Sequence, residues 1–452
     1  MPVKTRRMSN QATLFIALLL LIICCPFAAR SDERPYDMEL VGGGAVIARD
    51  GPKTGFPSVV RVPDWVSVEE RAHPRAKYYL YYGTHHGDHI MMKWAASLHG
   101  PWEEYNLGGR FHHFTRRGVL DTRSDPLRDS FGHIAGPDIH VDQERKLFVM
   151  FFHGENQPAT TTPNGTIVPR RHENFVATSS NGLNFNDPVS CGGQPGFGPK
   201  TVTVDGVTRD VWIGSEYQRA FRHGGEWYSL SKRAVIGKPR NSNDPFAANP
   251  RDPFGMAWME ARQPTPLWDQ DASKVQPTYF SPAAAFLASS EFENHPHNPH
   301  PGVRILSRNE RLNQLSVCLL PNDRLEVFFF VRGDPGDRYP SIYRVIYDIQ
   351  ESDFQKWDVA RDASGKVIFD VIVTPEEVAS AVRKSRPNLK PMYHADPVSF
   401  GSSDIFVDTD GLKYLFFSYV SQKFSGEEGE GQISAIRLIP RANTSATRSD
   451  LD

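Results

Sequence analysis

Carboxylates recur in this sequence where short strand-like segments begin. Asp138 follows a proline at the start of one segment, Glu216 opens a second, and Asp404 opens a third. Two acidic groups that face one cavity can together catalyse hydrolysis of a glycosidic bond. A protonated acid assists the leaving group, and an ionised carboxylate activates water or attacks. Asp138, Glu216 and Asp404 are therefore candidates for such a pair.

Histidines and further acids follow the long apolar segments or lie near the strand starts. The imidazole and carboxylate groups in residues 85–89 could hold a metal ion, although we favour a solvated loop that contacts substrate. The sequence leaves the metal ligands unknown. Our candidates for substrate binding are His85, His86, Asp88, His89, His133, Arg219, His394 and Asp396.

Repeated units must position these residues. Long apolar runs begin at Lys77, Lys146, Glu226, Arg324 and Lys413, at intervals of 69 to 98 residues. A shorter strand-like segment precedes each run, and a third strand follows most of them. Five units of three to four strands predict an all-β fold, a five-bladed β-propeller with extended loops. A pair of β-sandwiches or a solenoid is the alternative.

Two local signals complete the expected fold. Thr374 can cap a short helix that begins at Pro375 and ends before Pro387. The spacing in Asp408–Gly411 imitates a calcium loop, but the segment lies between two strands, and we interpret it as a hairpin turn.

Propeller geometry restricts where chemistry can occur. The first strand of each blade lines the central funnel, and the second strand runs antiparallel to it. The starts of first strands and the ends of second strands should therefore share one face. Asp138 and Glu216 should lie at that mouth with the loop that carries His85 and His89.

Short motifs give the chain a resemblance to a known group. Pro137-Asp138 is followed by a turn and a long aromatic strand, and Gly100–Trp102 and Asn181–Phe185 end third strands. Residues 40–440 resemble the five-bladed propeller glycosidases of glycoside hydrolase families 43 and 32, the arabinanase, invertase and levansucrase group. The stretch His133–Gly154 is most similar to an uncharacterised secreted branch of that group.

The resemblance implies specific roles and leads us to predict Asp138 and Glu216 as the catalytic residues. It makes Asp138 the blade-two aspartate that tunes a pKa and orients groups, and Glu216 the general acid of blade three. The general base of that group is an Asp before a proline in blade one, and this chain has Phe56-Pro57 there. Asp88 or Asp396 could substitute, and the base stays unassigned. The resemblance implies no required cofactor and allows a structural calcium ion, which His394 could help to hold.

The ends of the chain and its cysteines give further expectations. Residues 1–31 have a basic start, an apolar run and small residues, as in a signal peptide, with an uncleaved or lipid anchor as alternatives. We expect the propeller to span residues 37–440 and residues 441–452 to be a disordered tail. The protein would be secreted or periplasmic. Cys191 and Cys318 could pair, but two cysteines define no framework.

These observations predict a secreted glycoside hydrolase that acts on an oligo- or polysaccharide. The alternatives are a propeller that binds carbohydrate without cleaving it, and a phosphorylase or lyase on the same scaffold. The formal net charge is −2, with acidic and basic residues interspersed. This balance gives no sign of nucleic-acid binding, or of membrane contact beyond the signal segment.

Overall fold

The computed structural model describes most of the chain from Arg34 onward. The described residues are 34–48, 54–84, 89–105, 120–121, 134–157, 160–161, 167–168, 171–186, 188–190, 200–204, 207–213, 216–236, 257–262, 282–287, 289–298, 302, 311–332, 341–353, 356–385, 399–420 and 431–441. The predicted signal peptide and Cys191 lie outside these ranges.

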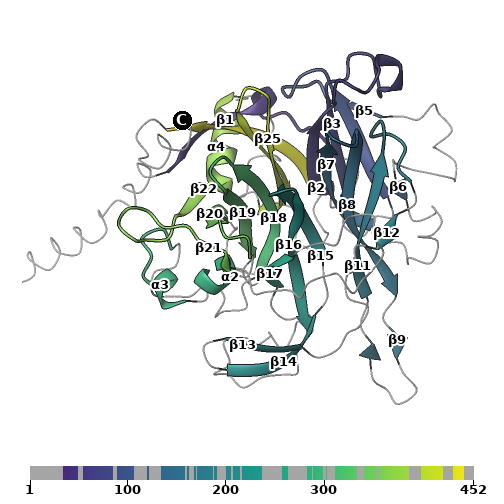
Figure 1. Cartoon of the computed structure of the whole chain (residues 1–452). Helices are drawn as coiled ribbons and strands as arrows, with labels where there is room; N and C mark the ends of the chain where they lie inside the picture. The colour runs from purple at the N-terminus through teal and green to yellow at the C-terminus, as the bar shows by residue number, and fades with distance from the viewer. Residues whose placement is uncertain are drawn as a thin grey trace, which may run out of the picture.

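Antiparallel sheets dominate the structure (Figure 1). Sheet 1 contains β2 (Thr54–Arg61), β3 (Tyr78–Thr84), β4 (His89–Ala95), β5 (Glu103–Glu104) and β6 (Leu120–Asp121). Sheet 2 contains β7 (Ile134–Asp142), β8 (Leu147–Gln157), β11 (Arg171–Ser179) and β12 (Val189–Ser190). Sheet 3 contains β13 (Lys200–Val204), β14 (Val207–Ile213), β15 (Glu216–His223), β16 (Glu226–Ile236) and β17 (Ala257–Arg262).

The remaining strands form two further sheets and a ribbon. Sheet 4 contains β18 (Arg311–Leu320), β19 (Arg324–Arg332), β20 (Ile342–Asp348), β21 (Asp358–Val359) and β22 (Phe369–Val373). Sheet 5 contains β23 (Ser399–Val407), β24 (Lys413–Val420), β25 (Gly431–Pro440) and β1 (Tyr36–Leu40). The ribbon pairs β9 (Thr160–Thr161) with β10 (Ile167–Val168).

One strand of each sheet faces a common axis. These inner strands are β2, β7, β15, β18 and β23, and each contacts the next in that order, with β23 returning to β2. The sheets therefore surround an axis as the blades of a β-propeller do. The all-β, propeller-like part of the predicted fold is confirmed.

Sheet 5 joins the two ends of the described chain. β1 pairs antiparallel with β25, so that Tyr36 lies opposite Pro440 and Leu40 opposite Ile436. The other three strands of this sheet come from residues 399–440. The ring of sheets thus closes by strand pairing between the beginning and the end of the domain.

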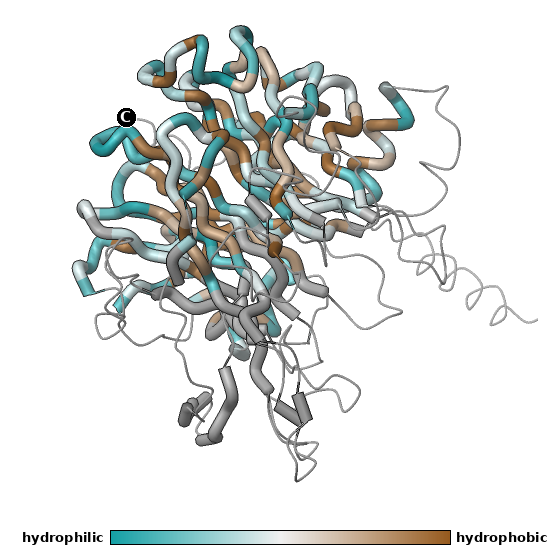
Figure 2. Tube along the Cα trace, turned by 90° about the vertical axis from the view of Figure 1, so that its right-hand side faces the viewer, coloured by the Kyte–Doolittle hydropathy of each residue, from teal (hydrophilic) through white to brown (hydrophobic). Residues whose placement is uncertain are grey.

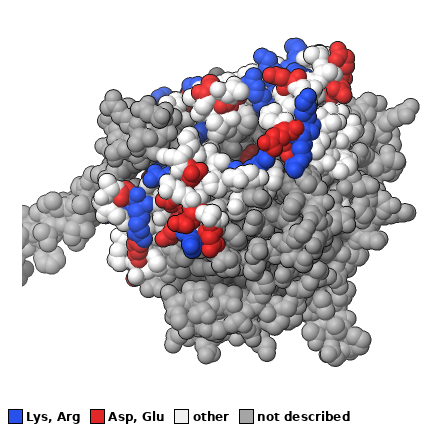
Figure 3. Space-filling view, in the orientation of Figure 1, with Lys and Arg blue, Asp and Glu red and all other residues white. Residues whose placement is uncertain are grey.

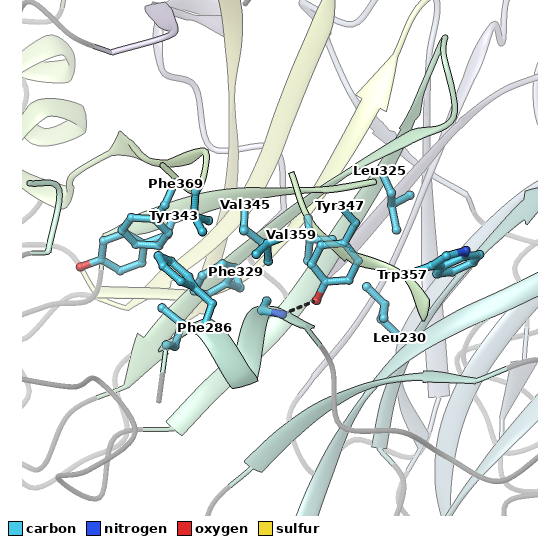
Figure 4. Close-up of a cluster of buried hydrophobic side chains, with 14 of the residues drawn as sticks. Leu230, Phe286, Leu325, Phe329, Tyr343, Val345, Tyr347, Trp357, Val359 and Phe369 are labelled. Carbon is cyan, nitrogen blue, oxygen red and sulfur yellow. Dashed lines mark hydrogen bonds between the residues drawn. The ribbon is translucent and has the colours of Figure 1, made fainter. Parts of the chain in front are cut away.

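Aromatic and aliphatic side chains fill the spaces between neighbouring sheets. Alternate residues of a strand face opposite sides, and both sides of each sheet are covered here, so the strands are apolar on both faces. Figure 2 shows brown apolar stretches through the packed strands and teal residues at turns. In the cluster of Figure 4, Phe329 and Tyr343 of sheet 4 pack with Phe286. Tyr347 OH accepts a hydrogen bond of 3.2 Å from the N–H of Ala283.

Helices are short and decorate the sheets. α2 (Pro282–Leu287) and α3 (Ser290–Glu293) lie against sheet 4, and η2 (Val41–Gly43) and η3 (Val68–Glu70) are single 3₁₀ turns. The predicted helix is α4 (Pro375–Ser385). The N–H of Glu377 donates to Thr374 Oγ1 at 3.3 Å, and the N–H of Thr374 donates to Glu377 Oε2 at 2.8 Å. The predicted cap at Thr374 is confirmed.

The described surface is mixed in charge. On the face of Figure 3, acidic and basic side chains of the described residues are interspersed. Among the described residues, four large apolar side chains are exposed, and they are scattered in the sequence: Val46, Val68, Leu319 and Val407. Within the described ranges, no helix is long and apolar enough to cross a membrane.

A buried network of charges links sheets 4 and 5. Glu326 accepts hydrogen bonds from Arg344 at 2.6 Å, from Lys413 at 2.5 Å and from the Tyr36 hydroxyl at 2.8 Å. Arg344 also donates to Asp370. Burial alone would raise the pKa of Glu326, but Arg344 and Lys413 outweigh burial and lower it. Because Tyr36 belongs to β1, this network attaches the closing strand.

We expect Glu326→Gln to lower the free energy of unfolding by about 3 kcal/mol at neutral pH, because it leaves the buried Lys413 without its countercharge. The loss should shrink as pH falls, since the stability that a lowered carboxyl pKa provides disappears below that pKa. Urea denaturation measures both effects. The matched control is Glu291→Gln, which removes the exposed pair with Arg361 and should cost at most about 1 kcal/mol. Equal losses in the two variants would contradict the assignment.

Candidate functional site

Each inner strand carries a bulge near its start. The register shifts between Gly55 and Ser58 in β2, Ala135 and Asp138 in β7, Glu216 and Arg219 in β15, Asn313 and Ser316 in β18, and Phe400 and Ser402 in β23. The first residue past the bulge is therefore equivalent in the first four sheets. Ser58, Asp138, Arg219 and Ser316 occupy one level around the axis.

Side-chain oxygens near this level join neighbouring inner strands. The N–H of Ile139 donates to Ser58 Oγ at 3.0 Å, and the N–H of Ala220 donates to Asp138 Oδ2 at 2.6 Å. The N–H of Val59 donates in the same way to Asp404 Oδ2 at 2.8 Å. Asp404 is therefore the counterpart of Ser58 and Asp138 in sheet 5. We call Asp138, Arg219 and Asp404 the axial charge cluster.

Asp138 has polar partners on several sides. His140 Nε2 lies 2.9 Å from Asp138 Oδ2, and because an ionised carboxylate only accepts, Nε2 carries the hydrogen. Arg219 Nη1 lies 3.6 Å from Asp138 Oδ1 and donates to the Pro137 carbonyl at 2.7 Å. The exposed fraction of Asp138 is 4 % and that of Arg219 is 2 %. Asp138 thus binds sheet 2 to sheet 3.

The two carboxyls of the cluster have opposite pKa shifts. Burial alone would raise the pKa of Asp138, but His140, Arg219 and the Ala220 N–H outweigh burial and lower it. Burial raises the pKa of Asp404 to about 6, and the charge of Asp138 adds to this effect against the attraction of Arg219. Asp138 is consequently ionised at neutral pH, and Asp404 gains a proton in mildly acidic solution.

Glu216 lies at a different level from Asp138. It precedes the bulge of β15 and lies opposite Lys232. The residues at the same register position in the other inner strands are Gly55, Ala135, Asn313 and Phe400, none of which is acidic. The described inner strands therefore place no second carboxylate at the level of Glu216.

Phe56 occupies the bulge of sheet 1, where the resemblance led us to look for an aspartate. Its φ of 58° is left-handed, as is the φ of 65° at Gly136, and both residues precede a proline. A positive φ is uncommon for a bulky residue. The N–H of Phe56 donates to Ser402 Oγ at 2.7 Å, and the buried ring packs against Ala135. Packing of sheets 5, 1 and 2 fixes Phe56 in this conformation.

The structure supports the expected geometry of the mouth. Antiparallel pairing places Thr54 of β2 opposite Thr84 of β3, and Ile134 of β7 opposite Gly154 of β8. Starts of first strands and ends of second strands do share one face. His89 begins the third strand of sheet 1, opposite Asp121 and away from the axis. The other predicted binding residues lie outside the described residues: His85, His86, Asp88, His133, His394 and Asp396.

No metal centre or disulfide is found in the described part of the chain. Among the described residues, no three His, Cys, Asp or Glu side chains come together as metal ligands. Cys318 is a free, buried thiol, and burial raises its pKa to about 12. Asp408 accepts hydrogen bonds from Tyr78 at 2.8 Å and Arg61 at 3.1 Å. Asp408–Gly411 is a hairpin turn, as predicted.

Sequence reasoning placed Asp404 at a strand start, like Asp138, but assigned no specific role to Asp404 or His140. The match is supported by a repeated pattern, Asp138-Ile-His-Val-Asp142 and Asp404-Ile-Phe-Val-Asp408. The contact of His140 with Asp138 has no such signal, since the equivalent residue of the second segment is Phe406.

Comparison with known sequences gives limited information. No protein-family model matches the chain. The uncharacterized protein R118 of Acanthamoeba polyphaga mimivirus is 29 % identical over 194 residues, which are 42 % of this chain and 44 % of that protein. The aligned region thus spans less than half the length of this curated relative.

Several solved glycosidase structures are similar over most of the chain. An endo-arabinase from Bacteroides thetaiotaomicron is 11 % identical with a TM-score of 0.45, covering 90 % of this chain and 99 % of that one. The GH43_1 enzyme from Xanthomonas citri, complexed with xylose, is 13 % identical with a TM-score of 0.43, covering 89 % and 91 %.

A xylan β-1,4-xylosidase from Bacillus halodurans is 13 % identical with a TM-score of 0.42, covering 88 % of this chain and 56 % of that one. These TM-scores are too low to establish the fold, and the identities are too low to transfer an activity.

We expect Asp138→Asn to lower the free energy of unfolding by about 3 kcal/mol at neutral pH, because the buried Arg219 loses the negative charge 3.6 Å away. A lowered carboxyl pKa stabilises the fold above the unfolded pKa, so the loss should vanish as pH falls through the folded pKa of Asp138. Urea denaturation at about pH 7 and about pH 3 measures the difference.

Ser58→Ala is the control for this variant, because Ser58 makes the equivalent hydrogen bond without a charge. It should cost about 1 kcal/mol at either pH. A loss in Asp138→Asn that is the same at both pH values would contradict an ionised Asp138.

Proposed function

We propose that this protein is a secreted, carbohydrate-active enzyme, a glycoside hydrolase built on a five-bladed β-propeller. The cyclic contacts of the inner strands of sheets 1 to 5 support the number of blades. The substrate would be an oligo- or polysaccharide that enters from the face where first strands begin. Glu216 would be the general acid, and Asp138 the supporting carboxylate.

The observation that carries this proposal is the link between Asp138 and β15. Asp138 accepts a hydrogen bond from Ala220, four residues after Glu216 on the same strand, and Arg219 of that strand faces its other oxygen. A carboxylate fixed and ionised beside the strand of the proposed acid matches a supporting role. Its charge would favour the protonated form of a nearby acid.

In the proposed reaction, Glu216 would protonate the glycosidic oxygen as the bond to the sugar breaks. A water molecule would supply the new oxygen, with its proton passing to a base. Phe56 excludes a carboxylate at the blade-one bulge, so the base must come from another position.

The second candidate is a propeller that binds carbohydrate without cleaving it. The apolar Phe56 at the blade-one bulge is the observation that favours it, because its backbone and ring are both engaged in packing. The full set of partners around Asp138 agrees with a structural role for that carboxylate. In this case, Asp138 would join sheets 2 and 3 and take no part in chemistry.

A glycan panel separates the two functions. We expect the purified protein to release reducing sugar from at least one oligosaccharide, and Glu216→Gln to lower kcat by about 10²- to 10⁴-fold, the usual contribution of a general acid. Asp138→Asn should lower kcat by a smaller factor and shift the basic limb of the pH profile downward, because it removes the charge that keeps Glu216 protonated.

The control is Asp142→Asn, which changes a carboxylate at the far end of the same strand, where it accepts from Arg145. Its kcat should stay unchanged. Binding of a glycan by all variants, with turnover by none and not by the parent, would establish the second candidate. Full activity in Glu216→Gln would refute the assignment of the acid.

A further inference from the structure

His140 holds one oxygen of Asp138 from the same strand. Its Nε2 donates to Asp138 Oδ2 at 2.9 Å, and the N–H of Ala220 on β15 donates to the same oxygen at 2.6 Å. The other oxygen, Oδ1, lies 3.6 Å from Arg219 Nη1. Two donors on different sheets thus converge on Oδ2, and together they set which oxygen of the buried carboxylate faces Arg219.

Packing alone does not require a histidine at this position. Phe406 is the equivalent residue of sheet 5, two positions after Asp404. The ring of His140 meets Trp227 of β16 edge to face, with centroids 5.4 Å apart and an angle of 79°. The ring of Phe406 meets Tyr78 of β3 in the same way, at 6.0 Å and 87°. A phenyl ring therefore fills the same position in another blade, and the histidine adds a hydrogen-bond donor.

The bond that joins neighbouring sheets is also independent of the histidine. Asp138 Oδ2 accepts from the N–H of Ala220, and Asp404 Oδ2 accepts from the N–H of Val59 at 2.8 Å. Both aspartates therefore make the same contact with the backbone of the next sheet. The bond from His140 is the feature that Asp138 has in addition, and it acts on the carboxylate itself.

We propose that His140 is a positioning residue of the active site, which fixes the carboxylate of Asp138 in the orientation that its supporting role requires. This inference rests on the proposed function and adds a residue to which the sequence motifs assign no role. The bond to Oδ2 holds the negative charge of Asp138 beside β15, the strand on which Glu216 lies. Without this bond, the carboxylate could rotate about the remaining bond from Ala220 toward Arg219.

The charged groups around Asp138 set the direction of its pH dependence. Among the described residues, those that act on it besides His140 are Arg219 of β15 and Asp404 of β23, and β8 presents the apolar Phe151 opposite it. Burial raises the pKa of Asp138, but the charge and hydrogen bond of His140, with Arg219, outweigh burial and lower it. Removal of His140 should therefore raise this pKa, so that Asp138 gains its proton at a higher pH.

The test compares the full-length protein with His140→Phe, which keeps an aromatic ring, as in sheet 5, and removes the donor. On the glycan that the parent cleaves, kcat should fall at least about tenfold while KM changes less than about twofold, since a misoriented group slows chemistry more than binding. The acidic limb of the pH profile should move to higher pH, because Asp138 is protonated earlier. Parental kcat and an unmoved acidic limb in His140→Phe would overturn the proposal.

His140→Gln is the conservative variant. Its side-chain amide can donate to Asp138 Oδ2 but carries no charge, so kcat should return to within about threefold of the parent. The acidic limb should still lie above its parental position. A histidine with only a structural role would change the melting temperature and leave the acidic limb in place. An equal loss of kcat in His140→Gln and His140→Phe would refute the role of the donor.

A second measurement does not depend on turnover. In His140→Phe, the carboxyl titration of Asp138, followed by carbon NMR, should have a higher midpoint than in the parent. In the parent, nitrogen NMR should show a proton on Nε2 of His140 at neutral pH, because this atom donates to Asp138. An unmoved midpoint, or a ring protonated at Nδ1 alone, would contradict the inference. The measurement on the ring decides the matter even if His140→Phe does not fold.

The control is Phe406→Leu, which changes the equivalent ring in sheet 5 and leaves His140 and Asp138 intact. It removes the contact with Tyr78 and should lower the melting temperature, with kcat and the acidic limb unchanged. If the parent cleaves no glycan, the proposed function fails, and NMR still decides whether His140 holds Asp138. If the parent is active and His140→Phe keeps its kcat and pH profile, only the positioning role fails.

Discussion

The inner edge of each sheet presents backbone N–H groups to the axis, and these groups need acceptors. A buried N–H without a partner costs about as much as a lost hydrogen bond. In sheets 1, 2 and 3 the need is met by side chains of the preceding sheet, through the pairs of Val59 with Asp404, Ile139 with Ser58, and Ala220 with Asp138. The same bonds fix the rotation of one sheet against the next. The side chains between neighbouring sheets then pack in the arrangement that these hydrogen bonds set.

The choice of acceptor decides the electrostatics of the axis. A serine hydroxyl satisfies an N–H without charge, whereas an aspartate brings an anion into a region from which water is excluded. Two of the three acceptors are aspartates, so a cation is required, and Arg219 supplies it. Because His140, Arg219 and the Ala220 N–H stabilise Asp138, Asp404 receives less compensation for its burial, and their pKa values separate. The polar groups that hold the sheets together therefore also determine the charge near the proposed site.

Local patterns predicted the fold well and the site only in part. The repeated turn and aromatic strand, as in Asp142 to Phe152, depends on neighbours in sequence, and the predicted sheets formed. The cap at Thr374 is local for the same reason. The bulges are less predictable. One extra residue between Ala135 and Asp138 changes which side chain faces the axis, and the sequence does not mark the register of either strand. Sequence reasoning therefore treated Asp138 and Glu216 as equivalent strand starts, although one lies past its bulge and the other before it.

Contacts between residues far apart in the sequence account for the part of the site that the sequence did not predict. No pattern in the sequence indicated that Arg219 donates to Pro137 on another sheet. Such a partner is set by the closure of the ring and by the length of the arginine side chain, neither of which has a short-range signature. The repeated Asp-Ile-x-Val-Asp pattern shows that some of this information was present. It required comparison of two blades that are far apart in sequence.

Strand β1 has a consequence for the order in which the molecule is made. Its hydrogen-bonding partner β25 lies about four hundred residues later, with Tyr36 opposite Pro440. Of the described strands, β1 is synthesised first and β25 last, so β1 cannot pair until almost all of the described chain has been made. During that interval β1 lacks its partner, and an unpaired strand edge can recruit strands from other chains. Tyr36 adds a polar hydroxyl whose partners Glu326, Arg344 and Lys413 come from later strands, which disfavours early burial of this strand in a wrong sheet. Completion of the ring is therefore a late event that demands the whole chain, and loss of either end should leave an open and aggregation-prone molecule.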